Sequence, residues 1–404
     1  MKKGSITLVI LLLAIVQFTH IVDFMLIMPM GETLMSYFEI DGQKYSYLVA
    51  GYPVAAFVVN IGGIFFLDKL NRKTALLIGY LGFTIGTIAC GVLPNTDDPT
   101  TNYYLFLGAR VLTGLFGGIL NSQVFSIVGD AVPFEKRATA MSYVMMAFSV
   151  ASVLGVPLSL LMMNVWGWQM PYVVVGGISI LVSFFIMVYL PPVTGHLENS
   201  KAQKSYATFL EVIRSKKLSK GLLFMLLMVM GQFTIIPFIA PYMIKNVGFT
   251  QEQIFWIYFV GGALTIVTSP FVGRLSDKYG KKKLFFIMAS LSTIPLIWVT
   301  NLGHVPLPAA LAVNALFFVC IGGRMVPANT LMTALVPPQL RGGYMSMNSA
   351  VQSLALFLSS IIAGMIVIAK ENQPIENYNI MGYIAVGFSI CAIFLMTQIE
   401  EPKK

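Results

Sequence analysis

The chain has 404 residues, of which 57% are hydrophobic and only 11% are charged, and it carries a formal net charge of +9. This composition excludes an ordinary soluble domain, because about a quarter of the residues of such a domain are charged. The basic residues are spread over several short segments instead of one patch, which argues against a nucleic-acid-binding protein. We therefore predict an integral membrane protein.

Twelve apolar runs follow one another along the chain, and a run of about 20 residues is long enough to cross the hydrocarbon layer as a helix. Helices are expected instead of barrel strands because backbone polar groups in lipid must pair within the segment, and the runs lack a polar alternation. The first run is too long for a secretory signal and no small-residue cleavage site precedes Glu32, so we expect it to be retained. The predicted spans are 6–30, 45–67, 74–93, 102–129, 138–163, 169–190, 220–244, 253–273, 283–300, 306–335, 343–369 and 379–398.

An internal repeat divides these spans into six and six. PFEKRATAMS at 133–142 matches PPQLRGGYMS at 337–346 with an offset of 204 residues, and LDKLNRK at 67–73 matches SDKYGKKK at 276–283. Two related halves predict a transporter that rocks about a central site. The fold class we expect is all-α, with two pseudo-symmetric six-helix bundles at 1–190 and 220–404 and a cytoplasmic linker at 191–219.

The distribution of basic residues predicts the orientation. If the first helix starts inside, the cytoplasmic tails and loops contain 21 of the 26 Lys and Arg residues, whereas the outer loops contain three. The positive-inside rule then places both termini in the cytoplasm, as for a multi-pass protein of the plasma (inner) membrane. Cys90, Cys320 and Cys391 all fall inside apolar runs, so we expect them to pack instead of forming disulfides or binding metal.

Three motifs resemble those of the major facilitator superfamily. GRLSDKYGKK at 273–282 is similar to its loop signature, and ARVLTGLFGG at 109–118 to its fourth-helix Arg-x-x-x-Gly motif. LGVPLSLLMMNVWGW at 154–168, with Gly155 and Pro157, resembles the fifth-helix motif of the drug and sugar-efflux proton antiporters. The resemblance implies alternating access and proton-coupled export. Ser159 and Gln169 replace a glycine and an arginine that are frequent in that branch. Because of these differences, we keep a symporter or facilitator as the alternative to an exporter.

The loops after the second and fourth helices predict a charge cluster. Asp68, Arg72 and Asp130 are placed to bridge neighbouring helices, and by resemblance such a latch favours the outward-facing state. The alternative is a set of solvated loop charges, each pair contributing about 0 to 1 kcal/mol. Asn71 replaces the motif glycine. Because asparagine tolerates a left-handed backbone, we expect the loop at 67–73 to form the same turn as the motif. The corresponding residues of the second half are Gly273, Asp277, Lys278 and Gly280.

Apart from Lys220 and Lys283, the first residues of their spans, four side chains that can be charged near neutral pH lie inside the predicted spans: His20, Asp23, Arg110 and Arg324. Inserting an Asp or Arg at the centre of a membrane helix costs about 2.5 to 3.5 kcal/mol of free energy. We therefore expect each of these charged residues to have a functional or structural role. Asp23 is the only carboxylate among them. Burial disfavours its charged form and a nearby cation favours it, so a change of conformation can switch it between proton binding and release. We predict that Asp23 carries the proton.

The other three charged positions have alternative interpretations. His20 lies on the same helix face as Asp23 and either relays the proton or is a neutral imidazole bonded to a neighbouring helix. Arg110 resembles the fourth-helix arginine that is assigned to proton coupling in the antiporters, or it only holds a helix interface. Arg324 either binds substrate or is a counter-charge for Asp23, and we favour the pair. The predicted substrate cavity consists of Gln17, Asp23, Asn121, Gln123, Gln232, Asn314, Arg324 and Gln352.

Several functions are excluded or disfavoured. The chain has no phosphate-binding Gly-x-x-x-x-Gly-Lys-Ser/Thr loop, so ATP-driven pumping by this chain is not expected. The intramembrane groups do not assemble an enzyme active site, no cofactor is implied, and two ligands on one helix are too few for a metal site. We predict a monomeric proton-coupled exporter of small, partly apolar molecules, with the lipid bilayer, substrate and protons as partners. The alternative is a symporter or facilitator that imports a nutrient or organic ion.

Overall fold

The computed structural model describes residues 3–66, 70–132, 140–141, 143–147, 150–193, 205–336, 341–370 and 373–399. Within these residues the regular secondary structure is helical apart from one isolated bridge between Ile368 and Glu376, and turns and loops connect the helices. Twelve helical spans of the described chain are long and apolar enough to cross a membrane. The prediction of an all-α membrane fold with twelve spans is confirmed.

The first half contains α1 to α8. The bounds are α1 (Lys3–Leu26), α2 (Gly31–Phe38), α3 (Gly42–Phe66), α4 (Arg72–Val92), α5 (Pro99–Ala131), the π-helical turn η2 (Ala151–Gly155), α7 (Val156–Trp166) and α8 (Met170–Tyr189).

The second half follows the linker helix α10 (Ser205–Arg214). Its bounds are α11 (Lys216–Phe233), η3 (Ile236–Phe238), α12 (Ile239–Tyr242), η4 (Met243–Val247), α13 (Gln251–Tyr279), α14 (Lys281–Thr300), α15 (Leu307–Leu335), α16 (Arg341–Ile366) and α17 (Tyr378–Thr397).

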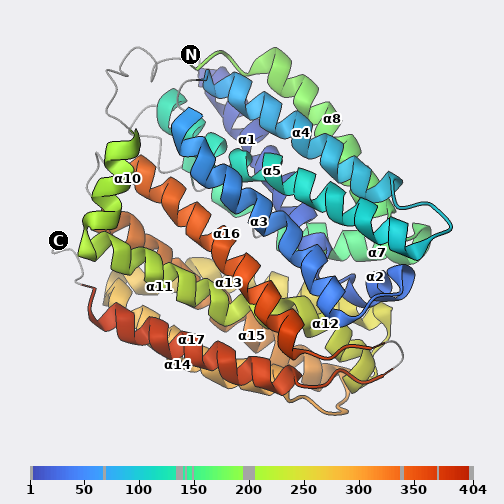
Figure 1. The fold of residues 1–404 in the computed structure, drawn as a ribbon. Helices are drawn as coiled ribbons and strands as arrows, with labels where there is room; N and C mark the ends of the chain where they lie inside the picture. The colour runs from blue at the N-terminus through green and yellow to red at the C-terminus, as the bar shows by residue number, and fades with distance from the viewer. Residues whose placement is uncertain are drawn as a thin grey trace.

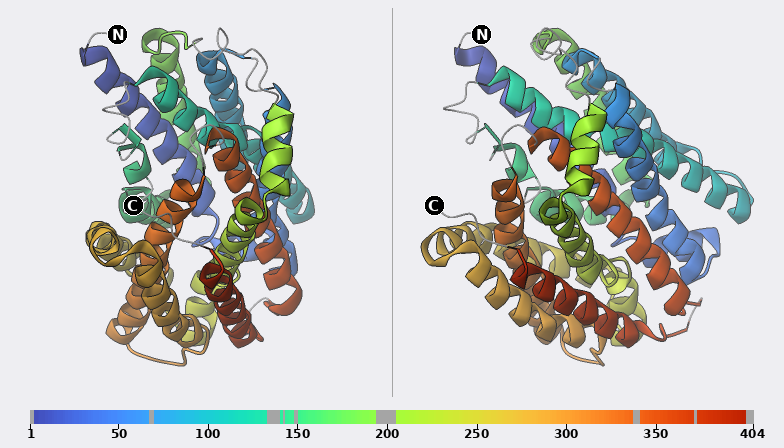
Figure 2. Two further views of the ribbon diagram at one scale, coloured as in Figure 1. Left: turned by 90° about the vertical axis from the view of Figure 1, so that its left-hand side faces the viewer. Right: turned by 60° about the vertical axis from the view of Figure 1, so that its left-hand side comes forward.

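The two halves form two bundles that lie against each other (Figure 1). α1 begins and α17 ends at the same end of the molecule, which we call the termini end; α2 and α12 lie at the opposite, far end (Figures 1 and 2). The main contacts between the bundles are those of α3 with α16 and those of α13 with η2 and α7, and smaller contacts join α2 to α12 and α5 to α16.

The first membrane helix of each half is broken near the far end. α1 stops at Leu26 and the chain turns before α2, whereas α11 stops at Phe233 and continues as short 3-10, α and π segments. Pro29 and Pro237 lie in the two breaks, where a residue without an N–H group cannot continue the helical hydrogen-bond pattern. The predicted span 6–30 therefore extends past the end of its helix at Leu26, whereas the predicted span 220–244 lies within one membrane span, Lys216–Val247, that contains a break.

One tyrosine hydroxyl lies between the two breaks. Tyr45 is fully buried, and its Oη lies 3.1 Å from the carbonyl oxygen of Ile27 and 3.1 Å from that of Pro237. Because these two carbonyls belong to different halves, the Tyr45 hydroxyl connects the halves at the far end.

Further contacts close the far end. The Gly42 N–H donates to the Ala369 carbonyl at 2.9 Å, and Lys245 Nζ lies 3.2 Å from Glu32 Oε2. Each of these contacts joins the first half to the second. The structure therefore has the two halves in direct polar contact at the far end.

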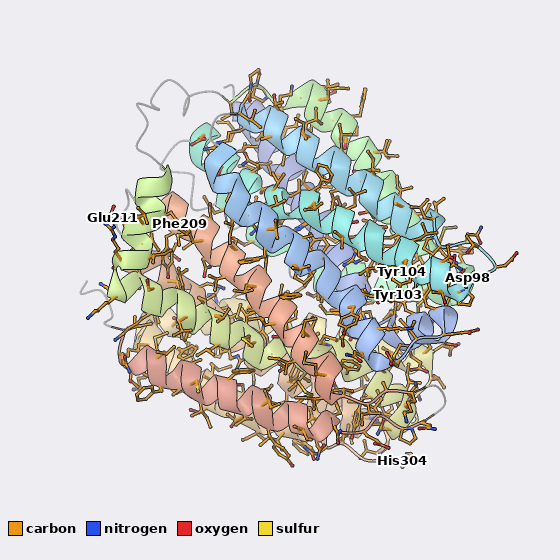
Figure 3. All side chains as sticks on the ribbon, in the orientation of Figure 1. Asp98, Tyr103, Tyr104, Phe209, Glu211 and His304 are labelled. Atoms are coloured by element: carbon orange, nitrogen blue, oxygen red, sulfur yellow. The ribbon has the colours of Figure 1, made fainter. Side chains whose placement is uncertain are left out.

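The predicted linker contains helix α10, which lies at the termini end against α3, α11 and α16. Val212 is buried on this helix and Phe209 packs against the core of the second half, whereas Glu211 is exposed (Figure 3). α10 is therefore amphipathic, with its apolar side on the bundles.

Candidate functional site

A buried ion pair joins α1 to α5. Arg110 Nη1 lies 2.9 Å from Asp23 Oδ2, and both side chains are fully buried. Thr87 Oγ1, from α4, donates to Asp23 Oδ1 at 3.0 Å. Both carboxylate oxygens therefore have a partner, which is what a charge removed from water requires.

The break in α1 contributes to this site. Asp23 lies in the last turn of α1, where carbonyl groups lack an intrahelical partner, and Arg110 Nη1 also lies 3.4 Å from the Asp23 carbonyl oxygen. A carboxylate at the negative end of a helix is unfavourable on its own, and a cation there is favourable. Arg110 therefore compensates both the side-chain charge and the helix end.

Tyr52 of α3 connects the ion pair to His20. The Arg110 guanidinium lies 5.1 Å from the centre of the Tyr52 ring, and the Tyr52 hydroxyl is hydrogen-bonded to His20 Nε2. His20 Nδ1 has no hydrogen-bond partner among the described residues, and no bond joins His20 to Asp23 there. This geometry matches the interpretation of His20 as an imidazole bonded to a neighbouring helix. A proton relay through His20 stays a prediction.

Glycines of the sequence motifs bring these helices together. A Cβ atom at Gly114 would collide with the Tyr52 backbone, and one at Gly118 would meet the Ala56 backbone at 2.8 Å, so α5 packs directly on α3. A Cβ atom at Gly155 would collide with Val22, the residue before Asp23. Both resemblance motifs therefore hold helices around the ion pair. Ser159, which departs from the motif, donates to the Gly155 carbonyl at 2.6 Å.

Arg324 does not reach Asp23, so the predicted pair between them is wrong in this structure. Its Nη1 donates to Ser389 Oγ at 2.8 Å and to Ser292 Oγ at 3.3 Å, and its Nη2 donates to the Met228 carbonyl at 3.2 Å. These partners lie on α17, α14 and α11 of its own half. The physical reason is that Arg324 faces the interior of the second bundle, where three helices supply neutral acceptors.

The amide side chains predicted for the cavity separate into two groups. Gln17 Nε2 donates to Asn121 Oδ1 at 3.1 Å, and Asn121 Nδ2 donates to Ser349 Oγ of the second half at 3.4 Å. This chain of bonds crosses from one bundle to the other. Each of the buried side chains in the second group has an oxygen without a partner among the described residues: Gln123, Gln232 and Asn314. Gln352, half-buried on α16, belongs to neither group.

Part of the predicted latch is present in the structure. Arg72 Nε lies 3.2 Å from Asp130 Oδ2, which joins the start of α4 to the end of α5, whereas Asp68 lies outside the described residues. Asn71 has φ −55° and caps α4 through its side chain, so the expected reliance on a left-handed asparagine is wrong. In the second half Gly280 has φ 97°.

The remaining latch residues make few contacts. Asp277 is exposed and has no ion pair within the described residues, and Lys278 lies over the Tyr279 ring. A Cβ atom at Gly273 would meet only Val326, at 3.9 Å. In the described part of the second half, the motif residues therefore form no cluster like Arg72 and Asp130.

Thr87 and Tyr52 were missed by the sequence reasoning. Neither is ionisable at neutral pH, and both fall within spans rich in similar residues, so helix periodicity gave no signal for their positions.

No group of three or more His, Cys, Asp or Glu residues that could hold a metal ion occurs in the described chain.

The family is shown by the sequence. The model of the Major Facilitator Superfamily matches residues 13–231 and again residues 221–404, which together cover most of the chain. This chain belongs to the Major Facilitator Superfamily. The predicted family resemblance is confirmed, and the chain is a membrane transporter of this superfamily.

Curated relatives in the superfamily share about a quarter of their residues with the chain. An uncharacterized MFS-type transporter, YwfA, of Bacillus subtilis is 24% identical over 92% of this chain and 86% of its own length. Multidrug resistance protein 1 of Bacillus subtilis is 24% identical over 96% of both chains. A probable sugar efflux transporter of Helicobacter pylori is 25% identical over 62% of this chain and 61% of its own length.

Solved structures show the same fold. A D-xylose-proton symporter superposes with a TM-score of 0.78 at 17% identity and covers 98% of both chains. The partially occluded, inward-open xylose transporter XylE of E. coli gives a TM-score of 0.75 at 15% identity over all of both chains. At these identities the likeness concerns the fold alone.

Proposed function

We propose that this transporter is a proton-coupled exporter, an antiporter of small, partly apolar molecules that works by alternating access. The observation that carries the proposal is the fully buried ion pair between Asp23 and Arg110. The named relatives that act in sugar efflux and multidrug resistance support the direction of transport. We further propose that it works as a monomer in the plasma (inner) membrane.

The ion pair suits proton coupling because protonation changes it strongly. A proton on Asp23 removes the charge that holds Arg110 Nη1. Arg110 Nε and Nη2 have no hydrogen-bond partner in the described structure, so this guanidinium has N–H groups to offer. A hydrogen-bond acceptor on the substrate would then compete with Asp23 for Arg110, and proton and substrate would exchange at one place.

The orientation of the molecule links this chemistry to two states. We propose that the termini end faces the cytoplasm, because that end carries the excess of Lys and Arg. The far end, joined by Tyr45 and by the pair between Glu32 and Lys245, is then the closed outer side. Release of substrate outside requires these contacts to break while other contacts form at the termini end. The Arg72–Asp130 pair of the proposed latch already exists in this structure, so a contribution of the latch to closing the termini end would come from Asp68.

Proton flux in reconstituted vesicles tests the proposal. With pH fixed inside and outside, a panel of amphipathic cations, sugars and organic anions is added, and proton movement is recorded. An antiporter gives proton movement opposite to that of the substrate. Movement in the same direction would indicate a symporter, and substrate movement without proton movement would indicate a facilitator.

Asp23→Asn is expected to abolish the proton movement while substrate exchange without a pH gradient continues. Asparagine keeps one oxygen that can accept from Arg110, and its NH2 group faces the Thr87 hydroxyl, which can accept a hydrogen bond, but the amide cannot carry the proton. The retained exchange shows that the variant is folded. Asp97→Asn, an exposed carboxylate in a far-end loop, is the matched control. Normal proton-driven accumulation in Asp23→Asn would refute the assignment of the carrier.

Tyr45→Phe tests the closed far end. Loss of the hydroxyl removes a hydrogen bond that contributes about 1 kcal/mol, so the population ratio is expected to shift about fivefold toward the state open at the far end. Spin labels at Asp97 and Gln373, in a background with the three cysteines replaced by serine, report the distance between the halves. The control is Tyr47→Phe, since the Tyr47 hydroxyl accepts from Gln43 of the same helix and has no other hydrogen-bond partner among the described residues. Equal distance distributions for Tyr45→Phe and Tyr47→Phe would contradict the prediction.

A further inference from the structure

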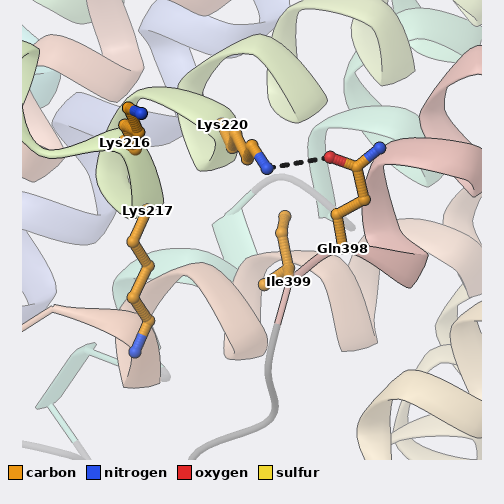
Figure 4. Close-up of a pocket in the computed structure, with 5 residues that line it drawn as sticks. All are labelled: Lys216, Lys217, Lys220, Gln398 and Ile399. Carbon is orange, nitrogen blue, oxygen red and sulfur yellow. Dashed lines mark hydrogen bonds between the residues drawn. The ribbon is translucent and has the colours of Figure 1, made fainter.

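A basic pocket lies at the termini end, between the start of α11 and the end of α17. It is lined by Lys216, Lys217, Lys220, Gln398 and Ile399 (Figure 4). The three lysines come from the first turns of α11, and Gln398 and Ile399 directly follow α17. This pocket is remote in sequence from the buried ion pair and contains none of the predicted transport residues.

The positive charge of the pocket is not balanced within the described chain. Lys220 Nζ donates to the neutral Gln398 Oε1 at 2.8 Å, and no described carboxylate pairs with Lys216, Lys217 or Lys220. Lys282, next to the pocket, donates to the carbonyl oxygen of Ile399 at 2.9 Å. The positive end of the α11 dipole points the same way. These groups together favour an anion over a cation or a neutral ligand.

The surface on the membrane side of the pocket is apolar. Leu223 lies three residues after Lys220 on α11, and Phe394 lies four residues before Gln398 on α17, so each shares a helix face with a pocket residue. Leu223 is 45% exposed and Phe394 is 62% exposed. A soluble anion gains nothing from these side chains, whereas the acyl chains of a lipid would cover them.

We propose that the pocket binds the phosphate headgroup of an anionic phospholipid, whose acyl chains lie along Leu223 and Phe394. Each basic side chain near a membrane surface strengthens the binding of anionic lipid about fivefold. Clustering three of them in one pocket beside an apolar face gives a site, in contrast to single basic residues distributed along a loop.

Two occupants compete with a lipid for this pocket. A soluble phosphate shares the headgroup chemistry but lacks acyl chains. The carboxylates of Glu400 and Glu401 follow Ile399 directly in the sequence and lie outside the described residues. The experiment therefore includes an arm for each.

Native mass spectrometry of the delipidated full-length protein, titrated with phosphatidylglycerol, tests the proposal. The double variant Lys216→Gln/Lys220→Gln is expected to bind this lipid about thirtyfold more weakly than the unmodified protein, about fivefold for each lysine removed. The control Lys73→Gln/Lys283→Gln removes the same charge at the same end outside the pocket, and it is expected to bind as the unmodified protein does. Phosphatidylcholine, which has no net charge, is expected to bind weakly to all three proteins.

Three results would overturn the proposal. The first is equal weakening in the pocket and control variants, which would mean general attraction instead of a site. The second is displacement of phosphatidylglycerol by soluble glycerol phosphate at similar concentration, which would make the ligand a soluble anion. The third is binding that occurs only in Glu400→Gln/Glu401→Gln, which would assign the pocket to the carboxylates of the chain itself.

Discussion

The two halves each bury one arginine completely, but they satisfy it differently. Arg110 in the first half pairs with the Asp23 carboxylate, whereas Arg324 in the second half is bonded to two hydroxyls and one carbonyl. By the 204-residue offset of the repeat, the residue of the second half that corresponds to Arg110 is the neutral Asn314. The second half therefore has no copy of the charged pair. The two halves therefore differ in the charge that they bury.

Among the described residues, the two buried arginines differ in whether protonation of a partner near neutral pH can change their bonding: it can for Arg110, and it cannot for Arg324. The ion pair of the first half contains a group that takes up a proton, and its neutralisation frees a cation. The hydrogen-bond partners of Arg324 among the described residues are two serine hydroxyls and a backbone carbonyl, which take up no proton near neutral pH. We therefore expect the coupling chemistry in the first half, with Arg324 holding α11, α14 and α17 together.

The largest expected effect comes from removing Arg110 alone. Arg110→Met leaves the Asp23 carboxylate buried without a counter-charge and is expected to destabilise the protein by about 3 to 5 kcal/mol. Adding Asp23→Asn removes the orphaned charge, so the double variant is expected to recover most of that stability without regaining proton coupling. Thermal unfolding in detergent measures both variants. A double variant that is no more stable than Arg110→Met would contradict the buried pair.

An intermediate effect is expected at the turns that begin α14 and α4. Gly280 has φ 97°, so Gly280→Ala is expected to cost about 1 to 2 kcal/mol of backbone strain. Asn71 has φ −55° and accepts from the Lys73 N–H at 3.0 Å, so Asn71→Ala loses a cap of about 1 kcal/mol, and Asn71→Gly loses less. The same unfolding measurement separates the two mechanisms. A destabilisation by Asn71→Gly as large as that of Asn71→Ala would argue against capping.

The smallest effect is expected at Arg324. Arg324→Met leaves the Ser389 hydroxyl bonded to the Ala385 carbonyl and the Ser292 hydroxyl bonded to the Ala289 carbonyl, so neither donor is orphaned. Replacing a buried cation by an apolar side chain of similar length is then expected to change stability by about 1 kcal/mol or less. Proton-coupled flux is expected to continue in this variant. Loss of coupling with retained folding would place Arg324 in the transport mechanism after all.

The sequence was sufficient to find the charged residues of the site but not their partners. Asp23 and Arg110 stand out because ionisable groups are rare in apolar spans, and this rarity is visible without a structure. The partner of Arg324 was mispredicted because depth in the membrane can be read from position along a helix, whereas the direction of a side chain depends on how the helix is rotated in its bundle. Thr87 and Tyr52 escaped notice for the same reason.

The fold divides in a similar way. Twelve spans, two halves and an all-α architecture could be predicted from the sequence. A chain segment crosses the bilayer as a long apolar helix, and the loop sequences of the two halves are similar to each other. Only the tertiary structure decided where α1 and α11 break, since proline tolerates several continuations and the neighbouring helices select one. It also decided that Tyr45 lies between the two breaks and that Asp23 contacts Arg110 and not Arg324, because contacts between distant segments depend on packing, which local sequence does not encode.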